Sequence, residues 1–591
     1  MDPHWQSFLS NPLPLCRRAA PAAAGLPHVR RTAVTASIAP RCGFRGRAAL
    51  PVAGTFVLLL LLAVAVQLWM GAFSVEHGLY SDDASHFMNG LLVRGYLSHA
   101  LGANPLRFAE TYYLHYPKIA PLMWPPLFHV VFGVALLLGA PAGVTALLLI
   151  AASSAWVAFR LFLMVTPLAG RPSAVAAVAL FFTTPLVMSM TSVVMLDVVI
   201  AALSIEAAWW LARFARSSST RDAAVFGVFT ALACLTKGNG VATVLIPVFL
   251  IAVTGQYDLL RRPGLYVAAA IVLIGAVPVL AVSASLDAGI GDFGPLPLWR
   301  ILQRLQFYGH QLDRNLGTIL CALAVIGAIA AIARRRRRPA TDAPLAEALL
   351  ALAAAGIGFH VFSPHIVSVS RYMTMAVAPI VGLALTGLAA VIPGKNVRIG
   401  RLSIAPLVVA AVAMLAVAQR SAIAPLSPLG YRDLIAQLHD SAGLAGRRVL
   451  VVSDEVGEGA AVTEAALLGL DPAPTIVRGS KLLARGDWGT IGALTHPTPE
   501  LLLRDLEDLH IEYVVLDFSP ASAALPYFSQ VRQITAGGSP PFEQLDGDTE
   551  AEIAGEARNL QLYHLTRQTP GEAKPIRIDL EHTLGRVLEE Q

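Results

Sequence analysis

The stretch LPVAGTFVLLLLLAVAVQLWM, residues 50–70, is followed closely by GLYSDDASHFMNG, residues 78–90. The first stretch is almost wholly apolar and has the length, about 20 residues, that an α-helix needs to cross the hydrocarbon core of a bilayer. The second places two neighbouring carboxylates, Asp82 and Asp83, soon after that crossing. A span that leads into a charged pair predicts a membrane protein with polar groups gathered at one face.

The composition of the whole chain agrees with this prediction. Of the 591 residues, 55% are hydrophobic and only 14% are charged, which is typical of a polytopic membrane protein. The net charge of +5 comes largely from arginines in the N-terminal tail and in short loops between apolar segments, so we expect it to set topology and expect no nucleic-acid partner. The four cysteines, at 16, 42, 234 and 321, fall in the tail or in predicted spans and indicate no disulfide framework.

Clusters of Arg and Lys mark the cytoplasmic ends of the spans. Beyond the tail they are Arg160 with Arg171, Arg213 with Arg216 and Arg221, Arg261 with Arg262, Arg334 to Arg338, and Lys395 with Arg398 and Arg401. Pairs of apolar helices between these clusters predict about eleven crossings, with the N-terminus in the cytoplasm. The apolar segment 121–140 breaks the parity of this count, and its Trp-Pro-Pro start favours a partial segment that enters from the outer face without crossing.

Three regions follow from this topology. Residues 1–47 predict a disordered, basic cytoplasmic tail, and residues 48–424 a membrane region with outer loops at about 71–120 and 285–315. Residues 425–591 contain the runs RRVLVVSD, APTIVRG and IEYVVLDFS, which predict buried strands between helices. We therefore expect a small α/β domain outside the membrane, in the periplasm of a bacterium.

The tips of the outward hairpins carry polar residues that should share a face with the Asp pair. They are Asp197 in VVMLDVVI, Lys237 in CLTKGNG, and Arg371 with Tyr372 in SPHIVSVSRYM. Each has an ordinary structural reading: Asp82, Asp83 and Asp197 suit helix starts, Lys237 could reach the interface by its long stem, and Arg371 with Tyr372 could anchor a span. Their shared side of the membrane favours a common site instead.

The order of these motifs resembles the GT-C membrane glycosyltransferases, which include protein O-mannosyltransferases and bacterial lipid A aminoarabinose transferases. The resemblance covers roughly residues 50–420 and depends on the carboxylate pair, the MLDVVIAALSIEAAWWLARF segment, LTKG, and SRYMTMAVAPIVGLALTGL. It implies an inverting transferase that takes a sugar from a polyprenyl-phosphate donor to a lipid, polysaccharide or protein acceptor, at the periplasmic face of the inner membrane. Asp83 stands where Glu is commoner in the family.

The resemblance also implies roles for residues. Asp82 matches the proposed catalytic base, Asp83 the second catalytic carboxylate of the pair, Asp197 a second acid of the outer face, and Lys237 and Arg371, with Tyr372 beside them, the cations at the donor phosphate. The chemistry agrees, because a departing phosphate needs cations and an acceptor hydroxyl attacks better when a carboxylate takes its proton.

Other candidates are less defined. His86 lies four residues after Asp82 and is a possible contact for substrate or for a divalent cation, although no cofactor is required; the metal question is open. Tyr112, Tyr113, His115 and Tyr116 either line an acceptor cleft or dock the loop on the membrane. Glu206, inside a span, is expected to pair with Arg213, with an acid that lines the cavity as the alternative. A lipid or solute transporter, or an inactive membrane scaffold, is the alternative to an enzyme.

Overall fold

The computed structural model of the chain describes residues 49–286, 296–337, 344–363, 368–391, 398–399, 402–403, 405–484, 493–536, 541–553, 556–580 and 586–590. The tail predicted for residues 1–47 lies outside these ranges. Residues 52–591 form one compact unit, and the fold below is that of this unit.

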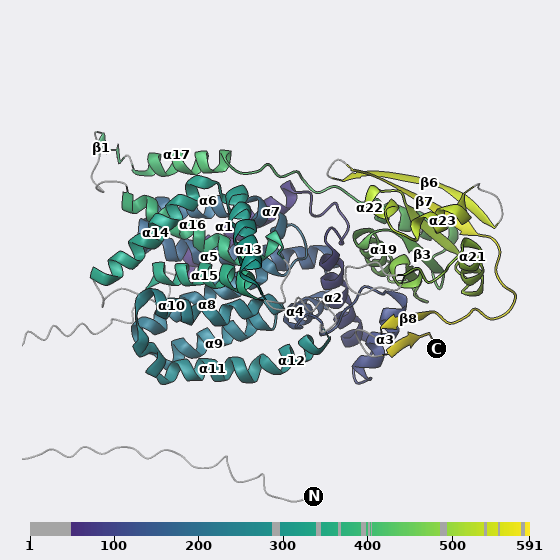
Figure 1. Ribbon diagram of the computed structural model, residues 1–591, viewed down its shortest axis with the longest axis horizontal. Coiled ribbons are helices and arrows are strands. Elements are labelled where there is room, and N and C mark those ends of the chain that lie inside the picture. Colours follow the sequence, from purple (N-terminus) through teal and green to yellow (C-terminus); the bar gives the residue numbers. More distant parts are fainter. Residues whose placement is uncertain are drawn as a thin grey trace, which may run out of the picture. The chain divides into compact units, whose positions relative to one another are not determined.

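Helices, most of them apolar, make up the greater part of the region between residues 49 and 418 (Figure 1). They are α1 (Ala49–Trp69), α5 (Ala142–Ala169), α6 (Arg171–Phe182), α7 (Pro185–Thr191), α8 (Asp197–Ser217), α9 (Thr220–Cys234), η1 (Gly238–Leu245), α10 (Ile246–Thr254), η2 (Tyr257–Arg261), α11 (Pro263–Gly275), α12 (Val277–Leu286), α13 (Leu298–Leu316), α14 (Thr318–Arg337), α15 (Leu345–Phe362), η3 (Ser370–Met373), α16 (Thr374–Val391) and α17 (Ala405–Ala418).

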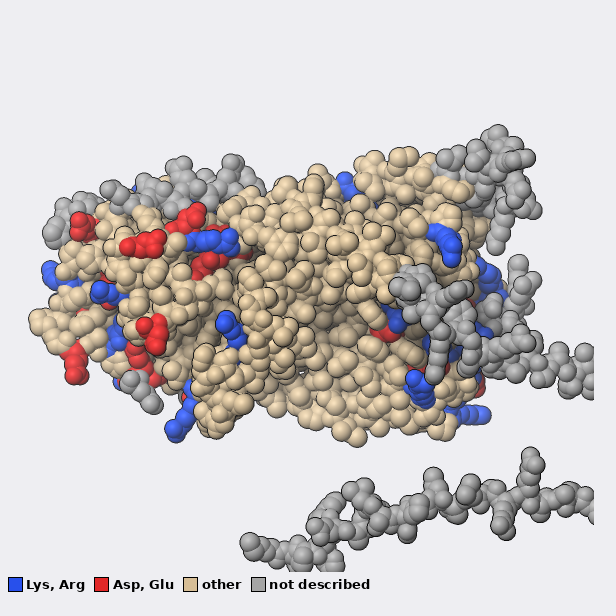
Figure 2. All heavy atoms as spheres, turned by 180° about the vertical axis from the view of Figure 1, so that it is seen from behind, with Lys and Arg blue, Asp and Glu red and all other residues tan. Residues whose placement is uncertain are grey.

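Five helices in the described ranges are long and apolar enough to span a bilayer, or seven when each of two bent helix pairs counts as one span. Shorter apolar helices at Ala53–Trp69, Gly238–Thr254 and Val408–Ala418 coincide with further predicted spans. The chain is thus a multi-pass membrane protein, while the count of eleven crossings stays a prediction. Figure 2 shows charged side chains gathered toward the two ends of one face, with a broad band between them that is nearly free of charge, as a bilayer-facing surface requires.

The first predicted outer loop folds into helices α2 (Ser81–His99) and α3 (Pro105–His115). It is followed by α4 (Leu127–Leu136), which lies within the segment predicted to enter the membrane only partly. Ten helical residues extend about 15 Å, roughly half of the hydrocarbon thickness. The length of α4 agrees with a partial segment, although its depth in a bilayer stays a prediction.

The C-terminal region is built around a sheet, with strands where the sequence predicts them. RRVLVVSD contains β3 (Arg448–Val452), APTIVRG contains β4 (Thr475–Arg478), and IEYVVLDFS contains β5 (Tyr513–Asp517), and these three strands run parallel. The sheet order is β4-β3-β5-β7-β6, because the antiparallel strands β6 (Phe542–Ile553) and β7 (Glu556–Leu565) extend it beyond β5.

The remaining elements of this region flank or accompany the sheet. They are the helices α18 (Tyr431–Ala442), α19 (Glu455–Leu467), α20 (Gly479–Leu482), α21 (Pro499–Asp508), α22 (Pro520–Ala523) and α23 (Phe528–Thr535), and the separate antiparallel pair β8 (Arg577–Leu580) and β9 (Arg586–Glu589). A second short pair, β1 (Arg398–Ile399) and β2 (Leu402–Ser403), lies outside this region, between α16 and α17.

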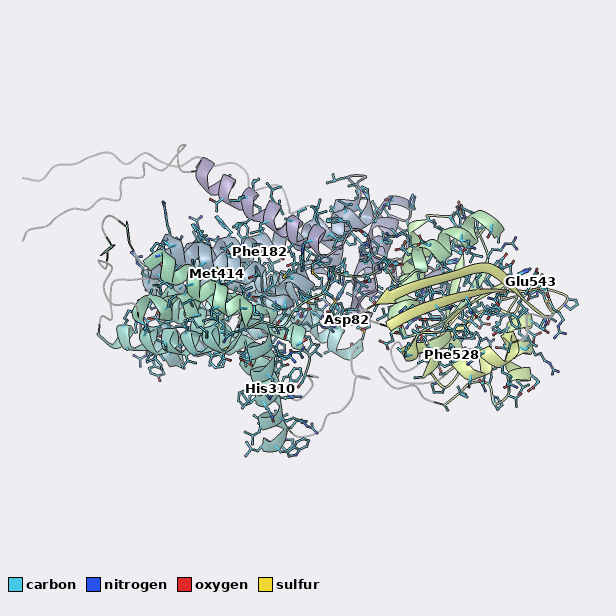
Figure 3. The ribbon with its side chains drawn as sticks, turned by 90° about the horizontal axis from the view of Figure 1, so that it is seen from above. Asp82, Phe182, His310, Met414, Phe528 and Glu543 are labelled. Carbon is cyan, nitrogen blue, oxygen red and sulfur yellow. The ribbon has the colours of Figure 1, made fainter. Side chains whose placement is uncertain are left out.

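The C-terminal region shares a hydrophobic core with the first outer loop. Phe87 and Met88 of α2 belong to the same buried cluster as Val451 of β3 and Ala461 of α19. The backbones also approach closely, since a Cβ placed on Gly78 would come within 2.9 Å of the backbone nitrogen of Ala460. In Figure 3 the labelled Asp82 lies where the helical part meets this region. The α/β region is therefore packed directly on the helix that carries the Asp pair.

Candidate active site

Four of the predicted charged residues come from four different elements and meet at one place. Asp82 is in the first turn of α2, Asp197 is the first residue of α8, Lys237 directly precedes η1, and Arg371 lies in η3 before α16. Each stands at the start of a helix or at a break between helices, where the chain can turn a polar side chain away from the apolar interior.

The contacts among them form a chain of ion pairs. Arg371 Nη2 lies 2.7 Å from Asp82 Oδ2, and Lys237 Nζ lies 3.5 Å from the same oxygen. Lys237 Nζ is also 3.7 Å from Asp197 Oδ2, so the ammonium stands between the two acids. Two carboxylates and two cations balance, which makes the burial of this cluster tolerable.

The cluster keeps unused hydrogen-bonding capacity. Neither carboxylate oxygen of buried Asp197 has a hydrogen-bond partner, and Nε of Arg371 is also without one in the part of the chain that the structure describes. Buried polar atoms are nearly always hydrogen-bonded, so such a group calls for a ligand, an ion or water. These atoms can therefore accept or donate hydrogen bonds to a ligand, an ion or water.

Asp82 has a depressed pKa. Burial alone would raise the pKa of its carboxyl, but the positive charges of Lys237 and Arg371, with a smaller effect from Lys118, outweigh burial and lower it. Asp82 is therefore ionised at neutral pH, and while both cations remain beside it, it is a weak base.

Asp83, the second acid of the pair, has a different environment. It is 1% exposed, and its two oxygens accept hydrogen bonds from the backbone N–H groups of Gly78 and Val194, each at 3.1 Å. Burial outweighs these donors and raises the pKa of Asp83 to about 7. Because Val194 belongs to the short segment before Asp197, the side chain of Asp83 ties α2 to the start of α8.

His86 pairs with a histidine that the sequence did not single out. His86 Nδ1 and His129 Nε2 of α4 are 3.1 Å apart, and both rings are buried. Burial and the nearby positive charges hold the pKa of His86 well below its usual value, so its ring is neutral. The Nε2 atom of His86 has no hydrogen-bond partner among the described residues, and the ring packs edge-on against Trp124.

The two cations, Lys237 and Arg371, lie near the ring of Tyr372. The Tyr372 ring centroid lies 5.7 Å from Arg371 Cζ and 6.0 Å from Lys237 Nζ. The Tyr372 ring also stacks on the ring of the buried His360 of α15. The two ring centroids are 4.8 Å apart, and the interplanar angle is 14°. The position of Tyr372 beside both cations agrees with the predicted grouping, whereas the buried side chain of His360 gave no sequence signal of its own.

A further cation, Lys118, connects the site to the C-terminal region. Its buried ammonium donates to the backbone oxygen of Glu455, at the start of α19, at 3.1 Å. Burial, with the charge of Arg478, lowers the pKa of Lys118 to about 8, although Glu455, Glu458 and Asp82 oppose this.

The aromatic group of α3 faces the C-terminal region. His115 Nδ1 lies 3.2 Å from Thr475 Oγ1 of β4, and Tyr113 packs against buried residues of the sheet region. Burial raises the pKa of Tyr112 and raises that of Tyr116 to about 12. Within the described ranges none of these four side chains makes a hydrogen bond, ion pair or ring contact with Asp82, Asp197, Lys237 or Arg371, so their place in the structure is the contact between loop and C-terminal region.

Two further expectations concern acidic residues. The described residues contain no group of three or more His, Cys, Asp or Glu side chains arranged to hold a metal ion. The predicted pairing of Glu206 with Arg213 is wrong: Arg160 of α5 donates to Glu206 Oε1 at 2.6 Å, and Arg213 instead lies 3.5 Å from Asp222. Two turns separate residues seven apart on one helix, so the neighbouring helix offers the nearer cation.

The comparisons with known proteins support the resemblance read from the sequence. Residues 124–281 match the family of dolichyl-phosphate-mannose-protein mannosyltransferases. No curated protein sequence matches the chain.

Two solved structures have a similar fold. The oligosaccharyltransferase of Archaeoglobus fulgidus in its apo form is 13% identical, with a TM-score of 0.51 over 81% of this chain and 71% of that one. ArnT from Cupriavidus metallidurans in the apo state is 13% identical, with a TM-score of 0.50 over 89% of this chain and all (100%) of that one. The chain thus has the GT-C fold, and the family match over residues 124–281 agrees with the resemblance to this superfamily.

Proposed function

We propose that the protein is an inverting glycosyltransferase that moves a sugar from a polyprenyl-phosphate-linked donor to an acceptor hydroxyl, at the periplasmic face of a bacterial inner membrane. The observation that carries this proposal is the cluster of Asp82, Asp197, Lys237 and Arg371 on a GT-C fold. The acceptor is a lipid, a polysaccharide or a protein.

The reaction needs a group that stabilises the leaving phosphate. As the bond between the anomeric carbon and the phosphate oxygen breaks, its electron pair passes to the polyprenyl phosphate, and negative charge grows there. Lys237 and Arg371 are held side by side against Tyr372, and Arg371 keeps an unpaired buried Nε. These two cations are suited to receive that phosphate.

The reaction also needs a base for the acceptor hydroxyl. The acceptor oxygen forms the new bond to the anomeric carbon from the opposite side, and its proton passes to a carboxylate. We assign this role to Asp82, with Asp197 as the second acid that hydrogen-bonds the sugar or the acceptor through its unpaired oxygens.

Donor binding would itself activate Asp82. In the structure Asp82 shares both cations, which lowers its pKa. A phosphate that takes hydrogen bonds from Arg371 and Lys237 adds negative charge beside Asp82 and weakens its hold on them, so its pKa rises and it becomes a better base.

The C-terminal region is proposed to help bind or orient the acceptor, because α19 packs on α2 and accepts a hydrogen bond from Lys118 of the first outer loop. A photoreactive acceptor should therefore label residues within 425–591. Labelling confined to the membrane helices would contradict this role.

The test uses the purified protein in lipid discs, with a panel of labelled polyprenyl-phosphate sugars and acceptors from membrane extracts. Asp82→Asn is compared with wild type and with Asp258→Asn, an exposed acid that pairs only locally with Arg262 at 2.5 Å. Loss of a base should slow transfer about a hundred- to ten-thousandfold in Asp82→Asn while Asp258→Asn keeps the wild-type rate. Equal rates for all three proteins would remove Asp82 as the base. A folded wild type that moves lipid across the disc and consumes no donor would instead support the transporter alternative.

A further inference from the structure

Three leucines of α13 lie outside the core of the protein. Leu298, Leu302 and Leu305 are 70%, 57% and 46% exposed, whereas the inward side of the helix buries Arg304 and Asn315 together with apolar side chains such as Leu316. A surface helix of a soluble protein normally turns its apolar side chains inward. The exposed leucines therefore indicate that this part of α13 faces an apolar medium.

The exposed surface of α13 has two distinct sides. At 100° per residue, Leu298, Leu302 and Leu305 lie along one line of the helix. The exposed polar side chains fill the neighbouring sector of the helix, roughly 60–160° round the axis from Leu298, and are Gln303, Gln306, His310, Asp313 and Arg314. A helix with one apolar and one polar exposed side fits a boundary between hydrocarbon and water.

Trp299 and Arg300 mark the level of this boundary. The Arg300 guanidinium carbon lies 5.3 Å from the centroid of the exposed Trp299 ring, at the first turn of the helix. Tryptophan and arginine are favoured where hydrocarbon meets head groups, because each joins an apolar body to a polar tip.

The chain continues from α13 directly into a membrane span. Gly317, with φ of +79°, turns the chain directly between α13 and α14. Along α14 the exposed side chains include Val325 and Ile329, as a lipid-facing surface requires. In Figure 3, α13, on which His310 is labelled, extends outward from the bundle of helices.

The inward side of α13 touches the wall of the candidate active site. Arg304 donates to the backbone oxygens of Val361 and Ser363 at the end of α15. The Tyr308 ring lies 6.3 Å from that of His360, which stacks on Tyr372 beside the cations. The membrane level that α13 marks is thus the level of Arg371.

From these observations we infer that α13 is an interfacial helix whose leucine face lies in the hydrocarbon of the bilayer, at the membrane face that carries the Asp82 cluster. The occupant of this surface is lipid. The inference does not depend on glycosyl transfer, since it follows from the burial of α13 and its continuity with a membrane span.

The test is site-directed spin labelling in lipid discs that hold one chain each. Nitroxides are placed by Leu302→Cys and Leu305→Cys, with Gln303→Cys and His310→Cys as matched controls on the polar side, in a background whose four native cysteines are replaced by serine. Collision with oxygen, which concentrates in hydrocarbon, is compared with collision with a water-soluble nickel chelate. The oxygen-to-nickel ratio should be several-fold higher at both leucine positions than at both controls.

Three outcomes would overturn the inference. Equal ratios at Leu302 and Gln303 would mean that the leucine face meets water. Shielding of the Leu302 and Leu305 probes from both reagents would mean that protein covers this face. If Arg304→Ala left the mobility of every α13 probe unchanged, α13 would not be held against α15. The position of α13 in the membrane would then not give the position of Arg371.

Discussion

Replacing Asp83 by asparagine should loosen the connection between the two acidic helix starts. The carboxyl accepts one backbone N–H from each side, Gly78 and Val194, and is 1% exposed. An asparagine side chain has only one oxygen, so it can accept only one of these two hydrogen bonds. Its NH2 group, which is a donor, then faces the other backbone N–H. Leaving one buried donor unpaired costs about 1–3 kcal/mol. We expect Asp83→Asn to lower the melting temperature, and to slow transfer because Asp197 loses its fixed position.

The raised pKa of Asp83 also predicts how the stability of the wild-type protein changes with pH. Burial raises the pKa of Asp83 to about 7 from its ordinary value of 3.8, so between these two values the native state holds a proton that the unfolded chain has lost. Over that window the stability of the wild type falls as pH rises, by up to about 1.4 kcal/mol per pH unit from this group. Asparagine cannot ionise, so the stability of Asp83→Asn lacks this slope.

The assay is thermal unfolding of both proteins in lipid discs, followed by intrinsic fluorescence at pH 5.5, 6.5 and 7.5. The melting-temperature gap should be largest at pH 5.5 and shrink toward pH 7.5. Asp258→Asn serves as the control, because this exposed acid pairs locally and should show no such trend. A gap of constant size across this range would refute a buried carboxyl that gains its proton on folding, and no gap at any pH would refute the bridging role.

The other predictions concern the cation, the base, the histidine pair and the sheet region. Arg371→Lys keeps the charge but loses the planar fork that contacts Asp82 at 2.7 Å, so transfer should fall at least about tenfold, with a higher donor KM in steady-state assays. Asp82→Asn should bind a polyprenyl phosphate without sugar more tightly than wild type, by titration calorimetry, because the acid no longer competes for the cations; weaker binding would contradict that competition. His86→Asn should slow transfer with an unchanged pH–rate profile, since the neutral ring of His86 does not titrate near neutral pH. Arg558→Met should leave Asp517 charged and buried and cost about 3–5 kcal/mol, visible as faster proteolysis of residues 425–591.

The sequence could predict that the charged residues lie close together, because this grouping depends on the side of the membrane on which each residue lies. Arg371 is 289 residues from Asp82, yet the positive-inside rule places both on one face, and the structure brings them to 2.7 Å. Patterns of buried strands likewise located β3, β4 and β5. These predictions succeed because membrane sidedness and strand burial depend on the charge and hydropathy of a whole segment, and both can be read from the sequence.

The contacts that were missed depend on single side chains from other elements. Nothing in the sequence distinguishes His129 from any histidine in an apolar helix, yet the packing of α4 on α2 sets its ring against His86. Glu206 could be recognised as needing a partner, but the choice of Arg160 depends on how α5 and α8 cross. The strands β6 and β7 carry mixed polar and apolar residues, so their pairing with the sheet is set by neighbours more than by their own pattern.

The charge balance of the site explains why its residues can be both buried and reactive. Two acids and two cations cancel when the site is empty, so the protein can fold without stranding an isolated charge. A phosphate that enters this cluster makes it net negative, and the excess charge falls on Asp82 and Asp197. The carboxylate that is too well paired to be a strong base thus becomes a better one when the donor is in place. In the mechanism proposed for this site, the acceptor hydroxyl therefore meets its stronger base only when the donor is in place.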